Sequence, residues 1–220
     1  CGYVALIGRP NVGKSTLLNR LLGQKLAITA HKPQTTRHNL LGIKTLEQGQ
    51  ILYVDTPGMH LRGDSALNRY LNRAAESLVQ DVNLVVFVIE ALRWTDEDQA
   101  VLDTLAQAGA KVVLAINKID RLADKTRLLP FLGDMGGRYD FAALVPISAQ
   151  KGKNLQALES AVLEQLPLGE AVFPEDQITD RPERFFAAEL VREQLTRRYG
   201  EELPYAVSVE IEHFEEVGNL

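Results

Sequence analysis

The sequence has 220 residues, of which 45% are hydrophobic and 24% are charged, and its formal net charge at pH 7 is −5. This length fits one large domain, or a domain of about 150–170 residues with an appendage. The acidic balance excludes a general attraction to nucleic acid or acidic lipid, so any such binding has to be local. No run of about eighteen apolar residues suggests a membrane span. The single cysteine, Cys1, excludes an internal disulfide framework and fits a reducing cytoplasm.

Short apolar runs rich in β-branched residues alternate with helical patterns along the first 166 residues. The runs YVALI, ILYVD, LVVFVI, VVLAIN and ALVPI lack polar alternation, which predicts central strands covered on both faces. An edge strand is predicted at 39–46, and helices at 14–22, 66–80, 96–108, 123–132 and 154–165. This alternation predicts a three-layer α/β fold with a mostly parallel sheet.

The pattern changes after residue 166. Residues 167–180 contain proline, glycine and acidic residues without a periodic apolar face, which is typical of a linker. Asp180 and Glu183 form a capping-box pattern that predicts a following helix. Its predicted apolar stripe consists of Ala187, Val191, Leu195 and Tyr199. The alternation in 203–214 predicts a half-buried strand, so a second, α+β unit is expected at 181–220.

The stretch GRPNVGKST follows the first predicted strand and precedes the first predicted helix, which is the context of a phosphate-binding loop. Glycines let backbone N–H groups close around phosphates, and Lys14 supplies a mobile positive charge. The hydroxyl of Ser15 can ligate Mg²⁺. The predicted phosphate-contacting residues are Gly8, Arg9, Pro10, Asn11, Val12, Gly13, Lys14, Ser15 and Thr16. This loop does not by itself distinguish GTP from ATP.

The stretch NKID at 117–120 supplies that distinction, because it ends the run VVLAI at the carboxyl edge of the sheet, where ligands of such folds bind. The Asp120 carboxylate can accept from guanine N1–H and the 2-amino group together, whereas adenine offers neither donor. Leaving a buried carboxylate unpaired corresponds to roughly 10⁴-fold discrimination or more. Asn117 is expected to brace the loop and the base, and the stem of Lys118 to pack over the ring. Alone, NKID is a common surface turn; after a phosphate loop it favours GTP.

Further motifs complete the predicted site. Asp55 begins DTPG and can hold Mg²⁺ through water, while the Gly58 N–H can meet the γ-phosphate. Within KPQTTRHN, either Thr35 or Thr36 can reach the metal; Thr36 is favoured, although an ordinary polar loop has the same composition. In PISAQKG, Ser148 and Ala149 are expected to place a backbone N–H against guanine O6. The predicted metal ligands are Ser15, Thr36 and Asp55.

Two residues are unusual for a GTP-hydrolysing site. Met59 directly follows D-x-x-G, where GTPases of the Ras type carry a glutamine that orients the attacking water. A thioether does not position water by strong hydrogen bonds. The side-chain oxygen of Asn11 can instead help to hold K⁺ where an arginine would otherwise reach; alternatively, Asn11 only ties the loop to its neighbours. The predicted catalytic residues are Lys14, Thr36, Gly58 and Asn11, and the predicted cofactors are Mg²⁺ and K⁺.

The order of the motifs resembles that of translation-factor-related P-loop GTPases: G-x-x-x-x-G-K-S, T-T-R, D-T-P-G, N-K-x-D and S-A. Some of these GTPases share the G-x-x-N-x-G-K-S loop, and their hydrolysis of GTP is stimulated by potassium. Five longer stretches are similar to sequences of the Era family of bacterial GTPases: KPQTTRHNLLGI, YVDTPGMH, RWTDED, FPEDQITDRPERFFAAELVREQL and LPYAVSVEIE. The single phosphate loop argues against the tandem-domain Der relatives, and the tail does not resemble MnmE relatives.

The resemblance implies a GTP-binding domain at 1–166, a linker at 167–180 and a KH-type domain starting at 181. It implies a hydrolytic switch that assists maturation of the small ribosomal subunit by binding 16S rRNA and the 30S subunit. A cytoplasmic monomer is expected, with peripheral contact at the inner membrane left open. The alternative is a switch whose GTP state is read by a protein effector, with the C-terminal part as a docking module.

One feature departs from the family. A KH domain contacts RNA backbone through a G-x-x-G loop between two helices, and no such sequence follows residue 166. The one match, GDMG at 133–136, lies in the predicted nucleotide domain and contains an acid. We therefore expect a partial KH domain at 181–220, weak RNA binding by these residues, and a chain that is part of a longer protein. The arginines of VREQLTRRYG fit either an RNA patch or a solvated helix face.

Overall fold

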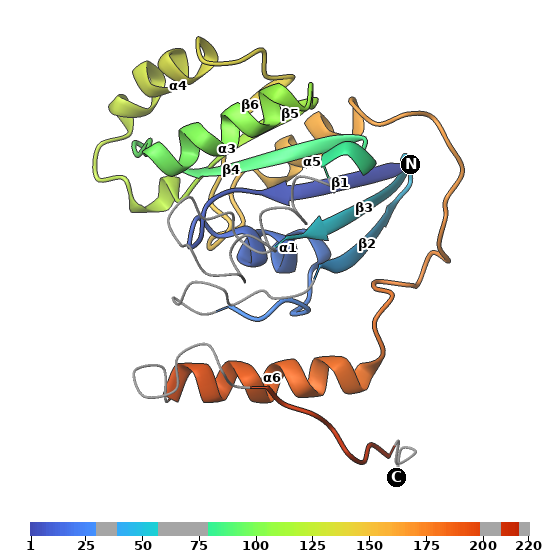
Figure 1. Ribbon diagram of the computed structural model, residues 1–220. Coiled ribbons are helices and arrows are strands. Elements are labelled where there is room, and N and C mark those ends of the chain that lie inside the picture. Colours follow the sequence, from blue (N-terminus) through green and yellow to red (C-terminus); the bar gives the residue numbers. More distant parts are fainter. Residues whose placement is uncertain (30–38, 57–78, 199–207, 216–220) are drawn as a thin grey trace.

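The computed structural model describes residues 1–29, 39–56, 79–198 and 208–215. Within these ranges, a six-stranded sheet lies between two layers of helices (Figure 1). Its strand order is β2-β3-β1-β4-β5-β6; β2 pairs antiparallel with β3, and every other neighbouring pair is parallel. The predicted three-layer α/β fold with a mostly parallel sheet is confirmed, and the stretch predicted as an edge strand forms the antiparallel edge.

The elements lie close to their predicted positions. The strands are β1 (Gly2–Ile7), β2 (Leu40–Leu46), β3 (Gly49–Asp55), β4 (Leu84–Glu90), β5 (Val112–Asn117) and β6 (Ala143–Pro146). The helices are α1 (Lys14–Leu22), α3 (Asp96–Gln107), α4 (Leu128–Gly136), α5 (Leu155–Leu163) and α6 (Glu183–Arg198), with 3₁₀ turns η1 (Ile119–Arg121) and η2 (Lys125–Arg127). Residues 79–81 are helical, and the rest of the helix predicted at 66–80 lies outside the described residues. In the described part of the chain, no helix has the length and apolar character needed to cross a membrane.

The two faces of the sheet bury different helices, because successive side chains of a strand point to opposite faces. In β1, Val4 and Leu6 pack with α1 and α5, whereas Ala5 and Ile7 pack with α3 and α4. The central strand β4 is buried on both faces, as its continuous apolar run predicts. The carboxyl ends of five strands consequently meet at one edge, between the helix layers.

The helix predicted at 123–132 begins later than expected, at Leu128. The Asp124 carboxylate accepts hydrogen bonds from the N–H and the hydroxyl of Thr126, and this contact caps the 3₁₀ turn η2. Regular α-helical geometry starts only after that turn. Pro130 then falls in the first turn of α4, where its missing N–H removes no helical hydrogen bond. The GDMG stretch lies in the last turn of α4 and is helical.

The segment 167–182 contains no regular helix or strand, but it is attached to the sheet. The N–H of Ile43 in β2 donates to the carbonyl of Ile178 at 2.8 Å. The fully buried Gln50 accepts from the N–H groups of Val172 and Phe173 at 2.9 and 3.0 Å, and it donates to the Phe173 carbonyl at 2.8 Å. The segment therefore covers part of the sheet edge, while the division of the chain into domains stays a prediction.

Helix α6 differs from its prediction in two respects. It begins at Glu183, two residues later than the capping-box pattern indicates. The predicted apolar stripe is not its buried face, since Val191 is 46% exposed while Arg192 and Glu193 are buried. Phe185 and Phe186 pack against the core at the start of this helix, and polar contacts of Glu193 attach its later part, so the predicted stripe gives the wrong face.

The strand predicted at 203–214 is not present in its described part, 208–214. Val209 and Ile211 are less exposed than their neighbours, as the alternation predicts. A strand also requires a partner for its backbone hydrogen bonds, and no described segment pairs with these residues. Alternation by itself therefore did not produce a strand here.

Replacing Gln50 with alanine is expected to lower the free energy of unfolding by about 1–3 kcal/mol, because the hydrogen bonds of this buried side chain to residues 172–173 are lost. Gln48→Ala, in the exposed turn between β2 and β3, is the matched control and should change stability by less than about 0.5 kcal/mol. Chemical denaturation measures both values. Limited proteolysis should also cut within 167–182 faster in the Gln50 variant. Equal stability of the two variants would contradict this anchoring role.

Candidate functional site

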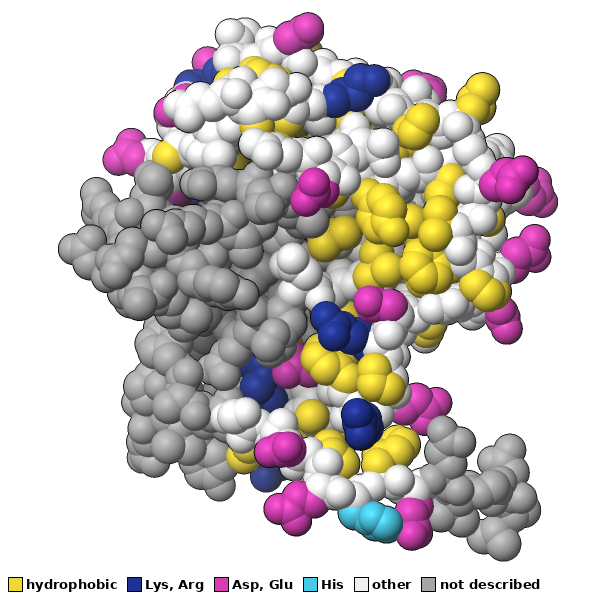
Figure 2. Space-filling model, turned by 45° about the vertical axis from the view of Figure 1, so that its right-hand side comes forward, with side chains coloured by type: hydrophobic (Ala, Val, Ile, Leu, Met, Phe, Trp, Pro, Cys, Tyr) yellow, Lys and Arg dark blue, Asp and Glu magenta, His cyan; other side chains and the backbone are white. Residues whose placement is uncertain are grey.

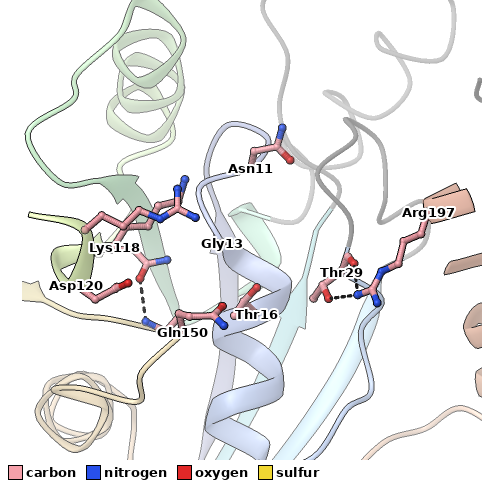
Figure 3. Close-up of a pocket in the computed structure, with 11 residues that line it drawn as sticks. Asn11, Gly13, Thr16, Thr29, Lys118, Asp120, Gln150 and Arg197 are labelled. Atoms are coloured by element: carbon pink, nitrogen blue, oxygen red, sulfur yellow. Dashed lines mark hydrogen bonds between the residues drawn. The ribbon is translucent and has the colours of Figure 1, made fainter. Parts of the chain in front are cut away.

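A cavity of about 540 Å³ lies at the sheet edge where the carboxyl ends of the parallel strands meet. It brings together residues of the predicted phosphate loop, of NKID and of the segment after β6 (Figure 3). Its lining residues are Asn11, Gly13, Thr16, Thr29, Asn117, Lys118, Asp120, Arg121, Ala149, Gln150 and Arg197. Crevices at this edge are where open α/β sheets bind ligands.

The phosphate loop passes too close to the neighbouring strand ends to carry side chains at two glycines. A Cβ on Gly8 would lie 2.4 Å from the Val88 carbonyl oxygen, and one on Gly13 would lie 2.4 Å from Asn117 Nδ2. Asn11 has φ of 62°, in the left-handed region that asparagine adopts more readily than most residues. The backbone conformation therefore gives a reason for an amide residue at this position, in addition to any contact that its side chain makes.

Lys14 is buried at the start of α1, and its ammonium donates to the carbonyl oxygens of Gly8 and Arg9 at 2.9 and 3.0 Å. Burial lowers the pKa of Lys14 to about 8; the Asp55 carboxylate raises it, and the Arg9 guanidinium lowers it further. A phosphate bound beside this group would stabilise its charged form. The N-terminus of α1 opens onto the same loop and favours an anion there as well.

Two of the three predicted metal ligands lie together. The Ser15 hydroxyl donates to Asp55 Oδ2 at 2.8 Å, and Asp55 is fully buried at the end of β3. A hydroxyl and a carboxylate oxygen at this spacing fit Mg²⁺, which prefers hard oxygen ligands. The third predicted ligand, Thr36, and the catalytic prediction Gly58 lie outside the described residues, as do Thr35 and Met59.

The side chain of Asn117 connects two loops that border the cavity. Its Nδ2 donates to the Val12 carbonyl at 2.8 Å, and its Oδ1 accepts from the Ala149 N–H at 2.9 Å, the bond drawn inside the pocket in Figure 3. Asn117 is nearly fully buried, so this bracket is shielded from water. The Ala149 N–H, expected to face guanine O6, is already engaged by Asn117 in this structure.

Asp120 and Lys118 lie on one side of the cavity, next to each other in Figure 3. Asp120 is exposed, and its Oδ1 accepts from the buried hydroxyl of Ser148, which therefore fixes the direction of the carboxylate. Lys118 has φ of 67°, and its ammonium donates to Glu90 at 3.0 Å. Ser148 thus has a side-chain role that the sequence did not suggest, in addition to its place in the S-A motif.

A charge network joins the phosphate loop to the NKID segment. The buried Arg9 guanidinium contacts Glu90 at 3.3 Å and Asp98 at 3.2 Å, and Glu90 also contacts Lys118. Burial tends to raise the pKa of Glu90, but Lys118 and Arg9 outweigh that effect and hold it below its usual value. Asp98 also accepts from the N–H of Thr95 and so completes the capping box of α3. The RWTDED stretch thereby supports the phosphate loop.

Several lining residues were not predicted from sequence. Arg121 and Gln150 directly follow predicted site residues, so their position in the chain could have indicated them. Thr29 and Arg197 carried no such signal. The α6 arginines were interpreted as a solvated face or an RNA patch, yet Arg192 is buried against Glu189 at 2.7 Å and Arg197 lines the cavity. The solvated-face interpretation is wrong for Arg192, which is buried, whereas Arg197 is exposed and also lines the cavity.

Comparisons with known proteins agree with this geometry. The family model described as "50S ribosome-binding GTPase" matches residues 3–118. The chain is 59% identical to the GTPase Era of Pseudomonas savastanoi pv. phaseolicola over 218 residues, which cover 99% of this chain and 73% of that relative. It is also 59% identical to the GTPase Era of Azotobacter vinelandii over 220 residues, covering 100% of this chain and 73% of that relative. The chain thus spans about three quarters of the length of these relatives.

Two solved structures have similar folds, each with a TM-score of 0.84. One is a variant of Era from Aquifex aeolicus bound to GDP·AlF4⁻, at 38% identity, covering 89% of this chain and 67% of that one. The other is Era in complex with MgGDPNP and nucleotides 1506–1542 of 16S ribosomal RNA, at 39% identity, covering 89% of this chain and 66% of that one.

Proposed function

The chain belongs to the Era family of GTPases, and on that premise we propose that its cavity binds GTP and GDP and that it acts as a switch in maturation of the small ribosomal subunit. One observation carries the nucleotide assignment. Three segments far apart in the chain, the phosphate loop, NKID and the segment at 148–149, border one cavity and are joined by Asn117.

In this proposal, the phosphates lie against the N-terminus of α1, where Lys14 exchanges its loop carbonyls for phosphate oxygens. Ser15 and Asp55, with Thr36, are the residues that would hold Mg²⁺. When bound, Mg²⁺ would neutralise the negative charge that develops on the phosphates during hydrolysis. The solved Era complex with MgGDPNP supports this assignment.

The base lies at the opposite end of the cavity. Asp120 accepts from guanine N1–H and the 2-amino group, and binding there buries a carboxylate that is exposed in this structure. The Lys118 stem lies along the ring, with its ammonium held by Glu90. The Ala149 N–H is shared between Asn117 and guanine O6.

Asp120→Asn is expected to weaken GTP binding by roughly 100-fold or more, because an amide cannot accept from both guanine donors. Xanthosine triphosphate should bind the variant better, since its 2-oxo group accepts from the new amide. Competition of labelled nucleotides measures both affinities. Asp124→Asn, on the neighbouring exposed turn, is the control and should leave the preference unchanged. Wild-type affinity for GTP in the Asp120 variant would exclude the base-reading role.

We also propose that Asn11 helps to hold K⁺ beside the phosphates. Its side chain lines the cavity, and Met59 leaves the site without the glutamine that orients water in GTPases of the Ras type. A cation held there can offset the charge that develops on the transferring phosphate. The left-handed backbone at residue 11 complicates the test, because alanine would strain the loop as well as remove the oxygen.

Hydrolysis of GTP is expected to be about tenfold or more faster in K⁺ than in Na⁺ at equal ionic strength, as a cation in the position of an arginine finger should accelerate this step. Asn11→Gly should lose most of that difference and keep nucleotide affinity, because glycine tolerates the left-handed conformation. Comparison of Asn11→Ala with Asn11→Gly separates the effect of backbone strain from that of losing the amide. Equal rates of the wild type in the two salts would remove the proposal and leave Asn11 a loop-forming residue.

The ribosomal role is supported by the solved Era complex that contains part of 16S ribosomal RNA. We propose that the natural protein containing these residues binds the 30S subunit in the cytoplasm, as a monomer. RNA affinity of residues 1–220 alone should be weak, since they lack a G-x-x-G loop after residue 166. Peripheral contact with the inner membrane is a further proposal.

Co-sedimentation of the natural protein with 30S particles is expected to be stronger with a non-hydrolysable GTP analogue than with GDP, because a switch exposes its binding surface in one state. Asp120→Asn supplied with the same analogue is the control for nucleotide occupancy. Equal co-sedimentation with 30S particles in the GTP-analogue and GDP states would contradict the proposed ribosomal switch. Capture of a protein effector only in the GTP state, without 30S binding, would favour the alternative function.

A further inference from the structure

Helix α6 packs Phe185 and Phe186 against the core at its start, and its later part contacts the segment after α1 through a polar cluster. This cluster consists of Lys25, Thr29, Glu193 and Arg197. Glu193 Oε1 accepts from the Thr29 N–H at 3.0 Å, and its Oε2 accepts from the Lys25 ammonium. Arg197 donates to the Thr29 carbonyl oxygen at 3.0 Å, shown in Figure 3, and to Glu193 at 3.0 Å. Figure 2 shows basic and acidic side chains next to one another between the body of the molecule and its C-terminal part.

Glu193 is the centre of this cluster. Its side chain has no exposed surface, although α6 is elsewhere partly exposed. Burial tends to raise the pKa of Glu193, but hydrogen bonds and charges from Lys25, Thr29 and Arg197 more than offset this and lower it. The carboxylate is therefore ionised and fully paired. A buried carboxylate that loses such partners is costly, so the cluster strongly favours one position of α6.

Thr29 is held on all its polar groups by α6. Its N–H and hydroxyl donate to Glu193, and its carbonyl accepts from Arg197. On the other side, the Asn19 side chain of α1 binds the backbone of Leu26 and Ala27. The segment 25–29 is thus fixed between α1 and α6. Because Thr29 and Arg197 both line the cavity, α6 forms part of its wall.

We propose that Glu193 and Arg197 hold this wall of the cavity closed and thereby slow the release of bound nucleotide. Glu193 acts as a positioning residue through Thr29, and Arg197 contributes its own side chain to the wall. In Figure 3, Arg197 and Thr29 lie across the cavity from Lys118 and Asp120, with Thr16 between them. The inference rests on the proposed binding of GTP and GDP in this cavity.

Docking of α6 and binding of nucleotide should affect each other reciprocally. If docked α6 slows nucleotide release more than nucleotide entry, docking raises the affinity for nucleotide. Bound nucleotide must then favour docked α6 by the same factor as the change in affinity. Any ligand that binds α6 only when it is undocked should then promote nucleotide release. The C-terminal part of the chain would communicate with the nucleotide through three side chains and one loop residue.

The test is the dissociation rate of a fluorescent GDP analogue from Glu193→Gln and Arg197→Ala. Glutamine keeps the shape of the side chain but loses the charge that pairs with Lys25 and Arg197. Each variant should release nucleotide on the order of tenfold to a hundredfold faster, the range that corresponds to losing charge-assisted hydrogen bonds. The controls are Glu183→Gln and Arg198→Ala, which remove the same charges from exposed positions of α6 and should leave the rate unchanged.

The outcomes separate the inference from the proposed function. Absence of GDP binding by the wild type would remove the proposed function itself. Normal binding with wild-type dissociation rates in both variants would overturn the inference alone. Acceleration in the control variants as well would also overturn it, because the effect would then reflect helix charge in general.

A measurement without substitutions covers the case in which a variant does not fold. Amide hydrogen exchange of residues 190–196 should slow when GDP is added to the nucleotide-free wild type, since occupancy and docking of α6 favour each other. Segments of α4, none of whose residues line the cavity, serve as the internal reference. Unchanged exchange in α6, with protection appearing in the phosphate loop, would overturn the inference.

Discussion

The bracket made by Asn117 is the contact on which the proposed nucleotide site depends. Three segments have to lie at fixed distances around one cavity, and each is a loop that could move independently. The two amide atoms of Asn117 tie the Val12 carbonyl to the Ala149 N–H at 2.8 and 2.9 Å. The sheet supports this arrangement, because β1, β5 and β6 are parallel and end at the same edge. Gly13 is required there, since any Cβ would collide with the same amide.

Two carboxylates, the partly exposed Glu90 and the buried Glu193, organise the surroundings of this bracket. Glu90 connects Arg9 to Lys118, and Glu193 connects Lys25, Thr29 and Arg197. In both cases, the opposing charges lower the pKa despite burial. Such clusters differ from apolar contacts because their energy depends on direction and on complete pairing. Such clusters hold loops in one position, and removal of a single partner releases the loop from that position.

Two groups of contacts attach α6 and the segment before it to the rest of the chain. Residues 172–179 are joined to the sheet through Gln50 and Ile43, so the start of α6 stays near the domain. The far half of the helix carries the polar cluster around Glu193, which joins it to Lys25 and Thr29. This division suits a helix that docks and undocks at one end while remaining tethered at the other.

Asn11 illustrates why one residue can have two explanations that the sequence does not separate. Its left-handed φ gives a backbone reason for asparagine, and its place on the cavity gives a chemical one. Both act through the same loop, so a substitution to alanine changes both at once. Glycine differs from asparagine in the chemistry alone, which makes the pair of variants informative.

The sequence by itself determined the sheet, its central strands and the position of the phosphate loop, NKID and S-A segments, because each is a continuous stretch whose backbone geometry depends on its own residues. It misplaced the start of α4 and the buried face of α6, where a side-chain cap and a polar docking surface override periodicity. Only the tertiary structure decided that Arg197 lies against Thr29, since the two are 168 residues apart. A contact at that separation leaves no local pattern in the chain; it exists only once the sheet, the linker segment and α6 have been placed around the same cavity.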